Sequence, residues 1–433
     1  MINLKQSMLL IYGLIAIIFF ILSESSGIFY LSLIYYIHYI FNFIKFRSFN
    51  IVYLAHVFIS IYFIFGLLIF NIYEYREFFL HNIDEALFSN KNLTIVNFIY
   101  FISLILLDWF YKPTKLSPIN NKNVFYKDTN GLYSKLVLTC SIAYLVVLIF
   151  SYYYLNGRYI WFIQETKGSI ELKIIWQLIS SGGLYLSALL PFIYINERYN
   201  KNKFIYLIVF LSSITLLMLG IRMYAMLLLF PIIINMQLRG FIYEGYKIYL
   251  YYIIFGLSVL IFAIFRFQTF DYTNTMAIFE TVAGEFVFPH SSAFYIIINP
   301  LSYDYWIVNL QDLLLQIMPA SIRVEFNPIL EEYTKYLLSN GLIAGYGGYF
   351  LVGQLYFYFG FLFFIPLLLI SKYFNVMNNV LFYKKKIYLM SFFSIFILVL
   401  PRMQIWTMKA MFYTLMFFLV FNFLIKKIKT KSL

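Results

Sequence analysis

Four arginines stand where they could bind a phosphate group. Arg222, Arg266 and Arg402 each lie at the end of a long apolar run, and Arg323 lies in a polar segment between two such runs. Arginine suits this role because its planar, permanently charged guanidinium forms paired hydrogen bonds with phosphate oxygens. The alternative is that each side chain extends to the lipid headgroups as a membrane anchor. We expect phosphate binding by at least some of them, because the orientation argued below places all four on the face where positive charge is otherwise avoided.

Three groups in the segment 280–290 could act as a general base, namely Glu280, Glu285 and His290, and of these we favour Glu285 and His290. A carboxylate or an imidazole near a bilayer surface can have its proton affinity raised toward neutrality, which suits proton removal from a hydroxyl. The alternative for either residue is an ordinary solvated position in a loop. Two further polar residues inside apolar runs have structural interpretations: we expect His56 to be a hydrogen-bonded packing residue and Asp108 to cap or pair locally.

Glycines cluster before and within the apolar run that begins near residue 349. Gly345, Gly347 and Gly348 precede the expected helix, where successive backbone N–H groups could bind an anion; close packing is the equal alternative. Gly353 and Gly360 are seven positions apart and therefore share a helix face, which favours close approach of another helix. No Lys-Ser or Lys-Thr pair follows, so this is not a P-loop.

The composition places these residues in a membrane protein. The chain has 433 residues, of which 63% are hydrophobic and 12% are charged. Globular domains carry about twice that charged fraction, so a soluble enzyme and a disordered chain are both excluded. The net charge of +13 is scattered between apolar runs rather than gathered on one face, which excludes nucleic acid as a partner. The single cysteine, Cys140, and the four dispersed histidines offer no metal site, and no cofactor is indicated.

Apolar runs of membrane-spanning length predict an all-α polytopic fold with about 12 transmembrane helices. We treat residues 1–433 as one integral membrane domain. The runs lie near residues 7–23, 28–44, 50–72, 94–111, 136–155, 174–195, 204–221, 223–238, 248–265, 349–371, 387–401 and 408–425.

The distribution of charge predicts the orientation. If both termini are cytoplasmic, about two-thirds of the 32 Lys and Arg residues fall in cytoplasmic segments, and most acidic residues fall outside. This orientation predicts a multi-pass protein of the plasma (inner) membrane.

Two external segments exceed what joining two helices requires. Residues 73–93 form a small polar cap, and residues 266–348 form a large external (periplasmic) loop. Within this loop, Ile307 to Met318 is an apolar stretch too short to span a bilayer, and Pro319 ends it. We expect this stretch to be an interfacial or re-entrant helix.

Two motifs in and after this loop resemble the Wzy-type polymerases, which assemble O-antigen and capsular polysaccharides from repeat units. The first is the proline stretch IMPASIRVEFNP (317–328), and the second is GYGGYFLVGQLYFYFG (345–360). In that family the helix after the main loop opens with Gly- or Ser-rich residues, then a polar residue, an aromatic residue and a glycine. The corresponding residues here are Gly347, Gly348, Gln354, Tyr356 and Gly360, with Gln354 standing where many members carry Glu.

The resemblance implies a glycosyltransferase that moves a growing glycan from undecaprenyl diphosphate to the non-reducing end of a new lipid-linked repeat unit on the outer leaflet. Its partners would be undecaprenyl-diphosphate-linked oligosaccharides, membrane lipids, a chain-length regulator and a flippase. The residues then take the following roles: phosphate binding by Arg222, Arg266, Arg323 and Arg402; base catalysis by Glu285 or His290; and substrate binding by Tyr303, Trp306, Gly347, Gly348 and Gln354.

Two other functions fit part of this pattern. A lipid-linked oligosaccharide flippase, or another transporter, also has about twelve spans and buried charges, but such proteins have short loops and internal repeats. The long loop and the lack of a visible repeat favour the polymerase. An O-antigen ligase uses the same class of donor, and the sequence separates it poorly from a polymerase.

Overall fold

The computed structural model describes residues 4–46, 51–75, 85–112, 132–157, 170–195, 203–221, 224–229, 232, 289–299, 350–383, 416, 420 and 424. Regular secondary structure in these ranges is helical throughout, with no strand, which confirms the all-α class. The chain divides into two compact units. Unit 1 contains residues 1–115, 269–378 and 399–409, and unit 2 contains residues 116–268, 379–398 and 410–433.

The predicted apolar runs coincide with helices wherever the structure describes most of their length. The helices are α1 (Leu4–Ile21), α2 (Ser25–Phe46), α3 (Ile51–Asn71), α5 (Asn90–Trp109), α6 (Leu132–Tyr154), α8 (Ile170–Ile195), α9 (Lys203–Met218), α16 (Leu351–Phe359) and α17 (Phe364–Tyr383). The runs at 248–265, 387–401 and most of 408–425 lie outside the described residues, as does most of 223–238.

Four helices are long and apolar enough to cross a membrane, among the residues that the structure describes. They are Leu4–Ile21, Asn90–Trp109, Val137–Tyr154 and Leu351–Met377, and two shorter apolar helices are Ile59–Asn71 and Phe204–Met218. By length and composition these four helices could span a membrane, while the full count of about twelve stays a prediction.

Unit 1 is built around α5. This helix contacts α1, α2, α3 and α16. In its most apolar stretch 61% of the residues are buried, against 11% in that of α1. Four polar side chains of α5 are buried, namely Thr94, Asn97, Ser103 and Asp108. A helix that crosses a membrane with polar groups must pair them inside the protein, because lipid offers no hydrogen bonds.

Hydrogen bonds of asparagine side chains join the helices at the end of unit 1 where α1 is followed by α2. Asn71 and Asn97 exchange two side-chain hydrogen bonds of 2.8 Å, which tie α3 to α5. Asn90 donates to the Ser23 carbonyl at 2.9 Å and accepts a hydrogen bond from the Ser25 hydroxyl. The tight turn between α1 and α2 is made by Ser23, which has a φ of 57°.

The long helices described in unit 2 are α6, α8 and α9, and α6 contacts both of the others. Gly182 and Gly183 of α8 leave room for the Tyr144 ring of α6, since a Cβ on Gly182 would lie 2.7 Å from that ring. The Tyr144 hydroxyl then donates to the Ile179 carbonyl at 2.8 Å. Small residues thus allow close helix contact here.

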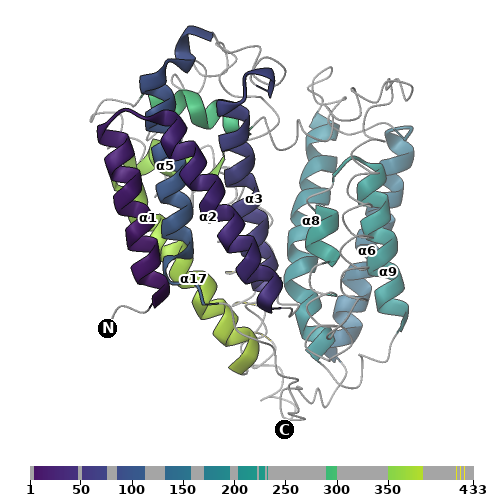
Figure 1. Ribbon diagram of the computed structural model, residues 1–433. Helices are drawn as coiled ribbons and strands as arrows, with labels where there is room; N and C mark the ends of the chain where they lie inside the picture. The colour runs from purple at the N-terminus through teal and green to yellow at the C-terminus, as the bar shows by residue number, and fades with distance from the viewer. Residues whose placement is uncertain are drawn as a thin grey trace. The chain divides into compact units, whose positions relative to one another are not determined.

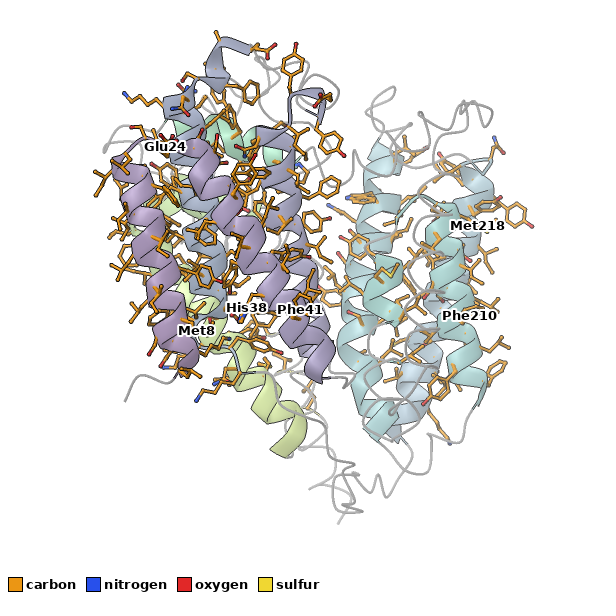
Figure 2. All side chains as sticks on the ribbon, viewed as in Figure 1. Met8, Glu24, His38, Phe41, Phe210 and Met218 are labelled. Carbon is orange, nitrogen blue, oxygen red and sulfur yellow. The ribbon has the colours of Figure 1, made fainter. Side chains whose placement is uncertain are left out.

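Large apolar side chains cover the outward helix faces of both units. Phe41 of α2 is 67% exposed, and Phe210 and Met218 of α9 are 53% and 43% exposed (Figure 2). Faces of this kind are expected where lipid rather than water surrounds a protein. Large exposed apolar side chains in such number are unusual for a soluble protein.

Candidate functional site

A buried helix, residues 289–298, comes from the segment that we predicted to be external loop. Ala293, Phe294, Ile296 and Ile297 in this helix are almost fully buried. Phe294 packs on Phe88 of the 3-10 helix η1 (Glu85–Phe88), with ring centroids 4.6 Å apart. The helix, green in Figure 1, therefore lies at the end of unit 1 opposite to the start of α1.

Within the predicted external segment, residues 289–298 are thus helical and buried, while the bounds 266–348 of that segment stay a prediction. The run Ala293-Phe-Tyr-Ile-Ile-Ile298 is apolar throughout, but it is far too short to span a bilayer. Burial inside the protein was the remaining option for such a run, and its composition could have indicated it.

His290 does not face solvent, contrary to the role that we considered for it as a surface base. Its side chain is fully buried, and Nδ1 lies 2.9 Å from the Tyr100 hydroxyl of α5. The imidazole also packs against the Phe350 ring, with centroids 4.5 Å apart. On the α3 side it fits only because residue 66 is glycine: a Cβ there would lie 2.6 Å from His290 Nδ1 and 2.6 Å from Tyr100 Cε1.

The depth of His290 in unit 1 follows from its neighbours on α3. Gly66 precedes the end of α3 at Asn71 by five residues, or about 8 Å of helix. In the predicted orientation, this end of α3 faces outward. His290 would then be a buried anchor just below the external face.

Helix 289–298 also docks onto α16. The Phe350 N–H donates to the Pro289 carbonyl at 3.0 Å. A Cβ on Gly353 would lie 2.6 Å from both Cα and Cβ of Ala293, so the two backbones approach as closely as glycine permits. The prediction that Gly353 serves close packing is confirmed.

The matching prediction for Gly360 is wrong. Gly360 caps the C-terminus of α16 with a φ of 51°, and its N–H donates to the Tyr356 carbonyl. The chain continues as a 3-10 helix, η3 (Gly360–Phe363), before α17 begins. Gly360 is therefore needed for a left-handed backbone conformation rather than for a helix face.

Gln354, which we predicted to bind substrate, is buried in α16 at 3% exposure. Its Oε1 atom and the Ser292 hydroxyl have no hydrogen-bond partner within the described ranges. Buried polar atoms of this kind usually bind water or a ligand.

The remaining predicted site residues lie outside the described residues. They are Arg222, Arg266, Glu285, Tyr303, Trp306, Arg323, Gly347, Gly348 and Arg402, together with the predicted helix Ile307 to Met318. Their mutual arrangement therefore stays a prediction.

A second polar centre lies at the opposite end of unit 1, around Asp108. Its Oδ1 atom is 2.6 Å from Lys5 Nζ, and its Oδ2 atom accepts a hydrogen bond of 2.9 Å from the Tyr35 hydroxyl. His56 stands beside the pair, with Nε2 3.8 Å from the same Oδ1. Within the described part of the chain, no group of three or more metal-binding side chains accompanies it.

The prediction that Asp108 pairs locally is wrong, because its partner Lys5 is 103 positions away on α1. The prediction for His56 is confirmed. Its Nδ1 lies 2.6 Å from the Tyr39 hydroxyl, and its ring stacks on Tyr111 with centroids 4.4 Å apart.

No protein-family model, curated protein or solved structure matches this chain.

Proposed function

We propose that the protein polymerises lipid-linked oligosaccharide repeat units at the external face of the plasma membrane. It would transfer a growing glycan from undecaprenyl diphosphate to a new repeat unit. In this reaction an acceptor hydroxyl attacks the anomeric carbon of the donor, and the bond from that carbon to the diphosphate oxygen breaks. The hydroxyl proton passes to a base, and the developing charge on the diphosphate requires cations placed beforehand.

The observation that carries this proposal is the burial of helix 289–298. A segment that charge and proline content mark as external is anchored in unit 1 by His290, which contacts α3, α5 and Phe350. A loop that merely joins two helices has no need of such an anchor. An anchored loop can hold a reactive group at a fixed place beside the membrane.

Chain geometry then favours Glu285 over His290 as the base. Because His290 is fully buried, it cannot touch a sugar hydroxyl without leaving its site. Glu285 precedes it by five residues, so the two Cα atoms are at most about 18 Å apart. We assign Glu285 the role of base and His290 that of a positioning residue.

Removing a phosphate-binding arginine should abolish long glycan chains. We expect Arg222→Ala or Arg266→Ala to give a normally inserted protein that lowers the yield of polymer at least about 100-fold, since one buried charge contact contributes roughly 3 kcal/mol in a transition state. Arg→Lys should rescue poorly, because lysine cannot form the paired contact. Gel analysis of surface polysaccharide measures the result. A normal ladder from both Ala variants would overturn the phosphate role.

The phenotype of a deletion strain tests the function itself. Cells that retain one repeat unit per lipid anchor indicate a polymerase. Loss of all surface repeats would instead indicate a carrier or an O-antigen ligase.

The Asp108 centre favours a carrier as the second candidate function. Ionisable groups buried in a membrane protein often mark ion or proton pathways, and His56 and Asp108 are buried here beside the partly exposed Lys5. A carrier would move lipid-linked oligosaccharide across the membrane without forming a glycosidic bond.

A further inference from the structure

Three oxygen atoms surround the ammonium group of Lys5 at the C-terminal end of α5. Lys5 Nζ donates to Asp108 Oδ1 at 2.6 Å, to the Asp108 carbonyl at 2.9 Å and to the Tyr111 carbonyl at 2.7 Å. An ammonium group has three N–H donors, so all three are used. The Tyr111 ring lies below the charge, 5.9 Å from Nζ to its centroid.

Contacts other than Lys5 also position the three oxygen atoms, which we call the oxygen cage. The Tyr35 hydroxyl donates to Asp108 Oδ2 at 2.9 Å, which orients the carboxylate so that Oδ1 faces the ammonium. The two carbonyls belong to the last turn of α5 and the residues just after it, where the negative end of the helix dipole favours a cation. On the other side, the Phe110 N–H donates to Ser371 Oγ of α17 at 2.9 Å and fixes this turn.

The size and charge of the cage select its occupant. Its nitrogen–oxygen distances of 2.6, 2.7 and 2.9 Å all exceed the roughly 2.0–2.1 Å that Mg²⁺ demands, and the two longer ones exceed the roughly 2.3–2.6 Å typical of Ca²⁺. Asp108 contributes one negative charge, which a monovalent cation neutralises. An ammonium group or a cation of that size fits.

Lys5 is the replaceable part of this arrangement. Its side chain is 34% exposed, whereas that of Asp108 is 7% exposed, so the cage opens to the surface on the lysine side. Lys5 lies in the first turn of α1, and only 11% of the residues in the most apolar stretch of that helix are buried. Leu9 and Ala16 are the buried residues of α1, and its other side chains are exposed or half-buried.

We propose that the C-terminal end of α5 is a binding site for an ammonium-sized monovalent cation, which the chain closes with its own Lys5. The start of α1 acts as a tethered plug. When the plug is withdrawn, Asp108 Oδ1 and the two carbonyls bind a free cation in its place.

Chemical rescue tests this site in the full-length protein in detergent. Lys5→Ala should lower the thermal midpoint, and ammonium or methylammonium chloride should restore at least half of the loss. Equal concentrations of sodium or tetramethylammonium chloride should not, because the first is small and strongly hydrated and the second has no N–H donor. Wild type should show no such selectivity, since its site is already filled.

Two further variants make the result decisive. Lys5→Ala combined with Asp108→Asn should lose the rescue, because the cage no longer carries a charge. Lys91→Ala, which removes an exposed lysine from α5, should behave like wild type. If Lys5→Ala does not fold alone, purification in ammonium chloride followed by its exchange for sodium chloride gives the same comparison. Equal stability of Lys5→Ala in ammonium and in sodium salts, in either format, would overturn the proposal.

Discussion

Replacing Gly66 by alanine should destabilise the protein by about 1–3 kcal/mol, the usual cost of overpacking a core. The new methyl group would lie 2.6 Å from His290 Nδ1 and 2.6 Å from Tyr100 Cε1, so both rings must move. These rings are joined by the hydrogen bond that anchors helix 289–298. Thermal unfolding in detergent measures the loss. If the proposed function is right, the same variant should also shorten the glycan ladder, because the anchored loop shifts.

Gly13 provides the matched control for this substitution. It also lies within an apolar helix of unit 1, but a Cβ there would meet nothing within 4 Å. Gly13→Ala should therefore stabilise the protein by up to about 1 kcal/mol, since alanine is the better helix former. The same chemical change thus has opposite signs at the two positions. A loss of similar size at both would show that the His290 pocket is not the cause.

Replacing Asp108 by leucine should have the largest effect on stability, about 3–5 kcal/mol, the usual cost of removing one partner from a buried ion pair. Lys5, the Tyr35 hydroxyl and His56 would all lose their shared carboxylate. The half-exposed Lys5 side chain can turn toward water, which places the expected loss near the lower end of that range.

The double variant Lys5→Met with Asp108→Leu separates charge from packing. An apolar pair of similar volume should recover a large part of the loss, because neither charge then has to be desolvated. Unfolding of the two single variants and the double variant in one detergent gives the coupling between the residues. Strictly additive losses would contradict a direct interaction between Lys5 and Asp108.

Hydropathy predicted the described helices well, because a bilayer imposes one length on every apolar run. The run at 50–72 became α3, Ile51–Asn71, and the run at 136–155 became α6, Leu132–Tyr154. Hydropathy did not predict that the helix in the run at 349–371 is interrupted at Gly360, because a left-handed backbone conformation does not change hydropathy. Composition reports which solvent a segment prefers, but not where its backbone bends.

The contacts of the candidate site were harder to predict than its residue types. The sequence singled out His290, Gln354 and Gly353, and the structure places all three in or beside two helices that touch. The sequence did not indicate that His290 would contact Tyr100 or Gly66, because these residues are about 190 or more positions away in the chain. The pairing of Lys5 with Asp108 was not predicted for the same reason: in the sequence, a lysine before the first helix is only one of the cytoplasmic charges that set the orientation.

The interior polar face of α5 has a consequence for biosynthesis. Of the four described helices of membrane length, it is the least apolar and also the most buried. Asn97 and Asp108 are poorly suited to lipid alone, yet their partners Ser25, Asn71, Tyr35 and Lys5 all lie on helices made earlier. Because α1, α2 and α3 are synthesised first, they can be in the bilayer before α5 leaves the ribosome. They then supply hydrogen-bond partners for the polar side chains of α5, so we expect a chain synthesised without its first three helices not to retain α5 in the membrane.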